Sequence, residues 1–147
     1  MVLRGEDGTT PEMLPVIIPE LQNRSVISVV SCEKHSGALT SSGKLLTWGS
    51  CYWGFLGLGD PKELPAGSPG GYAEEEQRAA ARARTYYHEK PPDVRVPVEV
   101  RFDHRLRAKG RVERYCFAVD KGDWHTAALV FDLAGDEVSP EDLEQDI

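Results

Sequence analysis

The chain has 147 residues, of which 40% are hydrophobic and 28% charged, a composition that fits a soluble globular protein and excludes wholesale disorder. No apolar run is long enough to cross a membrane and no signal peptide follows Met1, so the expected location is intracellular, in the cytoplasm or the nucleus. The formal net charge of -7 argues against a general attraction to nucleic acid.

The N-terminal part predicts a polar lead-in followed by three short β-strands. Residues 1–13 are rich in Gly, Thr and Glu, and the proline-containing stretch LPVIIPEL after them is expected to be extended. The glycine of Ser41-Ser42-Gly43 can adopt positive φ and predicts a tight turn between the second and third strands. Residues 14–65 are therefore expected to form one antiparallel unit, with strands at Val26–Val30, Ser36–Thr40 and Lys44–Trp48.

Residues 66–92 interrupt the β pattern and predict a helical insertion. The segment opens with a Gly/Pro-rich stretch, closes with two prolines, and carries good helix formers from Ala73 to Arg84. Glu74 and Arg78 form an i,i+4 pair, and acidic residues precede basic ones along the helix, which suits the helix dipole. Because the helix lacks a broad apolar stripe, we expect it to be solvated.

A second, incomplete unit is expected over residues 93–135. Arg95–Val100 alternates around Pro97 and predicts either an edge strand or the strand that leads into this unit. Two further strand signals follow at Arg111–Val119 and Thr126–Leu133.

Charge is unevenly distributed near the C-terminus. Residues 101–114 contain six basic and two acidic residues, whereas residues 132–147 contain seven acidic residues and no basic one. The basic run lacks the interleaved aromatic side chains that base stacking needs, so we do not expect it to bind nucleic acid. Within residues 136–147, Ser139-Pro140 is a typical helix start, and a short acidic helix or tail is expected there.

The chain also repeats itself weakly at a distance of ninety residues. In that register His35 aligns with His125, and the motif His-Ser-Gly-Ala-Leu aligns with His-Thr-Ala-Ala-Leu. Apolar positions of the preceding strands align as well, with Val29 on Val119. Such self-similarity is typical of repeat architectures, in which one supersecondary unit packs on the next.

No motif in the sequence predicts catalysis, a bound cofactor or a metal. Cys32-x-x-His35 is a single short-range pair, whereas structural zinc sites usually contain two. No G-x-S-x-G elbow accompanies the histidines, and Gly54, Gly57 and Gly59 run in the reverse order of a dinucleotide fingerprint. The three cysteines suit reduced thiols better than a disulfide framework. We therefore expect a non-enzymatic protein in which the repeated histidine is structural.

The stretch Val26–Gly59 resembles the repeat of the regulator of chromosome condensation family. An apolar strand is followed by His-x-x-Ala-Leu, a glycine turn, Trp-Gly and the glycine-rich motif GFLGLG. In the second copy Gly122 takes the place that Cys32 has in the first. The family builds seven-bladed β-propellers, so the resemblance implies a mainly β fold of about two antiparallel blades, part of a longer propeller. Its structural repeat residues would be His35, Gly43, Trp48, Gly49, Gly54, Gly57, Gly59, Gly122, Trp124 and His125.

Within that family, residues 37–59 are most similar to fungal F-box proteins called SCF-associated factors. This similarity implies that the chain captures substrates for a ubiquitin ligase built from Skp, cullin and F-box proteins. These residues contain no F-box motif, so binding to Skp would need an F-box encoded upstream. The founding member instead implies guanine-nucleotide exchange on a Ran-like small GTPase with chromatin contact, and an inactive fragment is a third hypothesis. Loops on a rigid frame commonly carry recognition, and the candidate partner-binding residues are Trp53, Phe55, Arg78, Arg82, Arg84, Tyr86 and Tyr87.

Overall fold

The computed structural model describes residues 16–83, 90–102, 114–123 and 125–133. Two antiparallel sheets dominate it: β1 to β4 form one sheet in that order, and β5 and β6 form a second, two-stranded sheet. The mainly β class expected from the sequence is thereby confirmed. The elements are η1 (Pro19–Leu21), β1 (Val26–Ser31), β2 (His35–Thr40), β3 (Leu45–Gly49), η2 (Tyr52–Gly54), α1 (Glu75–Ala83), β4 (Val94–Glu99), β5 (Arg114–Gly122) and β6 (His125–Asp132).

The first three strands form a meander because short turns join them. The turn between β2 and β3 contains Gly43, whose φ of 76° lies in the left-handed region that favours glycine. The pairs Ala38↔Leu46 and Leu39↔Leu45 set the register of β2 on β3. All three strands predicted from the sequence are confirmed, and their ends differ from the prediction by one residue at most.

β4 completes the first sheet and does not open the second. It pairs with β3 through Leu46↔Glu99 and Thr47↔Val98. Residues 93–135, expected to form one unit, are therefore divided between the two sheets, and the insertion 66–92 lies between the third and fourth strands of the first sheet. Pro97 fits this outer strand, because proline has no N–H to donate to a further neighbour.

The hairpins β1–β2 and β5–β6 share one register at a distance of ninety residues. Val29 pairs with Ala38 in the first hairpin, and Val119 pairs with Ala128 in the second. The regular ladder is interrupted between Val26 and Ser28 in β1 and at the equivalent place, between Cys116 and Ala118, in β5. The weak repeat in the sequence therefore corresponds to two hairpins of the same geometry, including the same β-bulge.

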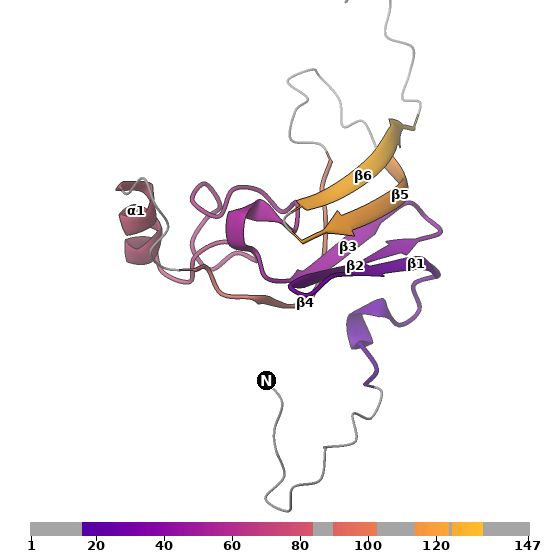
Figure 1. Ribbon diagram of the computed structural model, residues 1–147, viewed down its shortest axis with the longest axis horizontal. Helices are drawn as coiled ribbons and strands as arrows, with labels where there is room; N and C mark the ends of the chain where they lie inside the picture. The colour runs from indigo at the N-terminus through magenta and orange to yellow at the C-terminus, as the bar shows by residue number, and fades with distance from the viewer. Residues whose placement is uncertain (1–15, 84–89, 103–113, 124, 134–147) are drawn as a thin grey trace, which may run out of the picture.

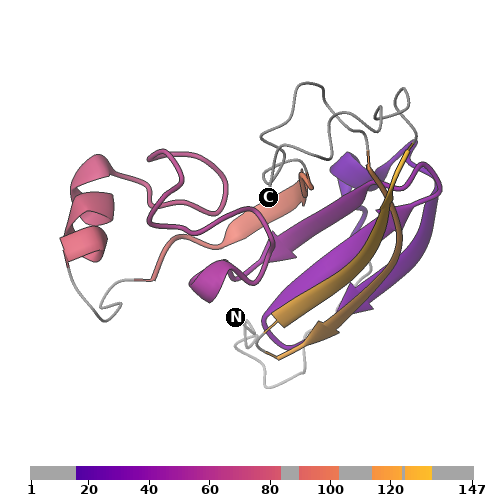
Figure 2. The same ribbon diagram turned by 90° about the horizontal axis from the view of Figure 1, so that it is seen from above.

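The hairpin β5–β6 packs on one face of the first sheet (Figures 1 and 2). The core between the two layers is formed by the buried residues Leu39, Leu45, Val100 and Cys116. Val119, Ala128 and Val130 pack against it from the hairpin. In Figure 1, η1 lies on the opposite side of the sheet, and η1 also contacts β4. The protein is thus layered, with apolar side chains between the layers excluding water.

The helix α1 lies apart from both sheets (Figures 1 and 2). It confirms the expected helical insertion, although it begins at Glu75 and not at Ala73. The backbone N–H of Glu74 donates to Oε1 of Gln77 at 3.2 Å, which is the return contact of a capping box. No residue of α1 is buried, as expected for a solvated helix.

Several predicted features lie outside the described residues. They are the polar lead-in 1–13, the acidic tail 136–147, and most of the basic run 101–114. Within the described part of the chain, no helix is both long and apolar enough to cross a membrane.

Candidate functional site

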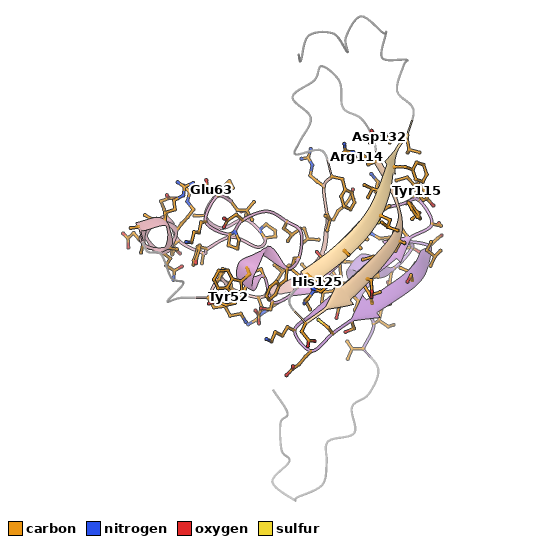
Figure 3. The ribbon with its side chains drawn as sticks, turned by 45° about the horizontal axis from the view of Figure 1, so that its top comes forward. Tyr52, Glu63, Arg114, Tyr115, His125 and Asp132 are labelled. Atoms are coloured by element: carbon orange, nitrogen blue, oxygen red, sulfur yellow. The ribbon has the colours of Figure 1, made fainter. Side chains whose placement is uncertain are left out.

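A pocket of about 360 Å³ opens at one end of the first sheet, where three loops meet. The loops are the turn between β1 and β2, the segment after β3 that includes η2, and the stretch that leads into β4. Tyr52, labelled in Figure 3, marks this end of the protein. The lining residues are Glu33, Lys34, Ser50, Tyr52, Phe55, Lys90 and Asp93.

Gly49 allows two of these loops to lie close together. It pairs with His35 at the end of β3 and has a φ of 111°. A Cβ at this position would lie 2.7 Å from the carbonyl oxygen of Lys34, so a larger residue would push the loops apart. The next residue, Ser50, donates its backbone N–H to that same oxygen at 2.9 Å. The glycine of the Trp-Gly motif, Gly49, thus holds together the two loops that form one side of the pocket.

Trp53 is an exposed aromatic residue in a conformation that side-chain-bearing residues rarely adopt. Its φ is 61°, in the left-handed region, and its side chain is 54% exposed. The ring contacts Tyr52 in a T-shaped arrangement with centroids 5.1 Å apart. Backbone strain of this kind persists where the surroundings impose it and often marks a binding site. Trp53 therefore lies next to the pocket as a large apolar contact surface.

The pocket carries charges of both signs. Glu33 and Asp93 contribute carboxylates, and Lys34 and Lys90 contribute ammonium groups. Lys90 and Asp93 form an ion pair of 2.6 Å between Nζ and Oδ1. Burial, followed by the charge of Asp93, raises the pKa of the neighbouring Cys51 thiol, so this thiol stays protonated at neutral pH. Such a lining suits a polar or zwitterionic ligand, such as a peptide segment.

A hydrogen-bonded chain behind the pocket joins the two layers through His35. The hydroxyl of Thr126 donates to the carbonyl oxygen of Phe55 at 2.6 Å, so it accepts from Nε2 of His35 at 3.1 Å. Nδ1 of His35 is then left to accept from the thiol of Cys32, 3.1 Å away. Burial, and secondarily the charge of Lys121, lowers the pKa of His35 and keeps it neutral.

These hydrogen bonds give His35 a structural role. Its ring also stacks on Phe55, which lines the pocket, with centroids 5.6 Å apart. The other two thiols lie in different surroundings: Cys51 donates to the carbonyl oxygen of Pro92, and Cys116 donates to that of Ala118. Among the described residues, no group of three or more His, Cys, Asp or Glu side chains could hold a metal ion.

Because of Lys121, the free energy of unfolding should depend on pH in the alkaline range. Burial lowers its pKa to about 8, and its Nζ donates to the carbonyl oxygen of Ser36 at 3.0 Å. Between that value and the pKa of about 10.5 in the unfolded chain, the unfolded state binds more protons. The contribution of Lys121 to the free energy of unfolding should therefore rise with pH across this interval and stay constant below it.

Urea titrations between pH 7 and 10.5 measure this contribution. Lys121→Met keeps the length of the side chain and should lower the slope of stability against pH relative to wild type. Equal slopes for wild type and Lys121→Met would contradict the assignment.

The predicted partner-binding residues fall into three groups. Trp53 lies exposed beside the pocket, whereas Phe55 is 5% exposed and supports the pocket from within. Arg78 and Arg82 attach α1 to the preceding loop: Arg78 donates to the carbonyl oxygen of Leu64, and Arg82 binds Glu63 and the carbonyl oxygen of Lys62. Arg78 also pairs with Glu75 within the helix. The remaining three, Arg84, Tyr86 and Tyr87, lie outside the described residues.

The residues expected to recur as structural elements also differ among themselves. Trp48 is half-buried, and Trp124 lies outside the described residues. The two histidines are not equivalent: His35 is buried, whereas His125 is exposed and its ring lies over Gly122. The five glycines of the first unit in this set all have positive φ, namely Gly43, Gly49, Gly54, Gly57 and Gly59.

Sequence reasoning missed the charged lining of the pocket. The sequence singles out neither Glu33 nor Lys34, and it places Lys90 in the insertion 66–92 and Asp93 at the start of the second unit. Their proximity depends on β4 pairing with β3 across the insertion, which no local pattern predicts. The only signal was their position directly beside predicted strand ends, where loops gather.

Comparison of the chain with protein-family models, with curated proteins and with solved structures found no match.

Proposed function

We propose that the chain is a non-enzymatic protein-interaction module, formed by neighbouring blades of a β-propeller, that captures a partner at the pocket beside Trp53. Two observations support the propeller arrangement: the two hairpins share one register, and the second packs face to face on the sheet of the first. The loops at one end of this frame converge on the pocket, which is where rigid scaffolds commonly carry recognition.

Trp53 is the observation that carries the proposal. An exposed tryptophan held in a left-handed backbone conformation presents a large surface without a further cost of ordering. Tryptophan and tyrosine are the residues most often found to dominate binding energy, and Tyr52 lies against Trp53. The pocket is large enough for one or two side chains of a partner.

The charges define the partner more closely. Because the lining carries both carboxylates and ammonium groups beside Trp53, the preferred ligand is an extended peptide segment with both charge signs and one bulky apolar side chain. The resemblance of residues 37–59 to SCF-associated factors supports a substrate of an SCF-type ubiquitin ligase as the source of this peptide segment. In that assembly the chain acts as part of the substrate receptor.

Selection from a phage-displayed random peptide library tests the binding site. Peptides enriched on the immobilised wild-type protein should bind it in calorimetry and should bind Trp53→Ala at least about 30-fold more weakly, as expected for a central aromatic contact. Lys90→Glu should weaken the acidic peptides in the set. Lys62→Ala, outside the pocket lining, is the control and should bind like wild type.

The receptor assignment needs a separate measurement. In cells, proteins that co-purify with the wild-type chain but not with Trp53→Ala should accumulate when cullin activation is inhibited. If peptides bind at Trp53 but no dependent protein changes in abundance, the interaction site stands and the ubiquitin-ligase assignment is wrong. If no enriched peptide distinguishes wild type from Trp53→Ala, the site itself is wrong.

A further inference from the structure

A second pocket, of about 390 Å³, lies along β4. One wall is formed by β4 and the two residues before it, and the other by the glycine-rich loop of the insertion, residues 67–73. Unlike the pocket beside Trp53, this pocket is mainly apolar, with side chains that include Tyr72, Val94, Val96 and Val98. We call it the β4 pocket, defined by residues 67–73, 92–96 and Val98.

The loop wall of the β4 pocket is held in one conformation. The backbone N–H of Gly67 donates to the carbonyl oxygen of Tyr72 at 2.8 Å, and the side chain of Tyr72 is only 1% exposed. Gly70 has a φ of 86°, and a Cβ there would lie 3.2 Å from the side chain of Leu58, so glycine lets the loop pack closely on the protein. A wall fixed in this way binds a ligand without a further ordering cost.

The β4 pocket carries an uncompensated positive charge. Its lining contains two charged side chains, Asp93 and Arg95. Asp93 is already paired with Lys90, at 2.6 Å between Oδ1 and Nζ. Arg95 is exposed, and its guanidinium group has no hydrogen-bond or ion-pair partner among the described residues. A carboxylate of the ligand is the complementary group, because pairs of guanidinium and carboxylate groups make strong, charge-assisted hydrogen bonds.

The two pockets adjoin, because Asp93 lines both of them. A ligand that extends beyond the pocket at Trp53 therefore reaches the β4 pocket across this residue. In an extended peptide, side chains two or four positions apart point the same way and are about 7 or 14 Å apart. One peptide segment can thus place two apolar side chains, one in each pocket.

We propose that the peptide segment captured beside Trp53 continues into the β4 pocket, where it places a second apolar side chain, and that Arg95 binds an acidic side chain next to it. This inference rests on the proposed function and specifies the ligand: two apolar residues, two or four positions apart, with Asp or Glu beside the second. Arg95 is then a specificity-determining residue, because a peptide without the carboxylate leaves its charge unpaired in the complex.

Calorimetry with the tightest-binding peptide from the phage selection tests the β4 pocket. A truncated form that ends before the second apolar residue and its acidic neighbour should bind wild type at least about tenfold more weakly than the full peptide, because it loses one buried apolar contact and one ion pair. Val96→Asn places an amide in the apolar lining and should weaken the full peptide at least about threefold, but not the truncated one. Val29→Asn is the matched control: Val29 is 62% exposed, against 48% for Val96, and is outside both pockets.

A charge exchange tests Arg95. Arg95→Glu should weaken the full peptide at least about tenfold, and changing the acidic residue of the peptide to Lys should restore binding to this variant. Arg24→Glu changes the net charge equally at an exposed arginine outside both pockets, so it controls for long-range electrostatics and should bind the peptide like wild type. Circular dichroism confirms that each variant is folded.

The outcomes separate this inference from the proposed function. Enriched peptides without the second apolar residue and its acidic neighbour overturn the β4 pocket as a binding site, as does a full peptide that binds Arg95→Glu like wild type. The pocket beside Trp53 stands in either case, provided that binding still depends on Trp53. Peptides that bind Trp53→Ala as tightly as wild type contradict the proposed function, and the extension into the β4 pocket falls with it.

Discussion

Leu39→Ala should lower the free energy of unfolding by about 3 to 5 kcal/mol, the upper part of the range for buried leucines. Leu39 is 2% exposed and lies in the cluster with Leu45, Val100 and Cys116, between the two layers. Removing its side chain leaves a cavity that neither layer can fill, because cross-strand hydrogen bonds hold both sheets in register. Urea unfolding followed by far-ultraviolet circular dichroism measures the loss.

Leu129→Ala provides a control for that experiment within the same chain. Leu129 occupies the equivalent position in the second hairpin but is 59% exposed. Its substitution should therefore change stability by less than about 0.5 kcal/mol. Similar losses for the two variants would mean that the stacking of β5–β6 on the first sheet is wrong.

Gly43→Ala should be the second most damaging change, with a loss of about 3 kcal/mol. Positive φ costs an alanine about 1 to 2 kcal/mol, and displacing packed atoms adds a similar amount. Here the new Cβ would collide with the ring of Tyr115. That ring is held in place, because its hydroxyl donates to the carbonyl oxygen of Ser41 at 2.7 Å and its face stacks on Phe131.

Gly67→Ala separates the two causes of that loss. Gly67 has a φ of 78°, close to the 76° of Gly43, but a Cβ there would have its nearest neighbour 4.0 Å away. It should cost only about 1 kcal/mol, the backbone part alone. In a double-mutant cycle, Tyr115→Ala should remove the excess loss of Gly43→Ala. Additive losses for Gly43→Ala and Tyr115→Ala would show that the ring does not oppose the new side chain.

The sequence predicts the local elements of this protein because each has a short-range cause. Gly43 marks the turn, the β-branched run after Val26 marks a strand, and the good helix formers from Ala73 to Arg84 mark α1. The ninety-residue repeat predicts the matching hairpins because one geometry needs apolar side chains at the same positions. The assignment of β4 could not be predicted, since Val94–Glu99 alternates equally well for either sheet and only tertiary pairing decides.

The candidate site is less predictable than the fold. Trp53 and Phe55 both stand in a glycine-rich motif and are both candidate partner-binding residues, but Trp53 is exposed whereas Phe55 is buried. The helical period shows that Arg78 and Arg82 lie on the same face of α1. It does not show that the backbone carbonyls of the preceding loop accept hydrogen bonds from their guanidinium groups. Side-chain burial in loops depends on contacts that are distant in sequence, which a single sequence does not contain.

The late arrival of β4 has a consequence for synthesis on the ribosome. β1, β2 and β3 are contiguous and can pair as soon as they emerge, but β3 waits for a partner until more than forty further residues have been made. During that interval the nascent sheet ends in an open edge with Leu46 and Thr47 on it. The helix of the insertion, which carries no buried residue, can form meanwhile without competing for that edge.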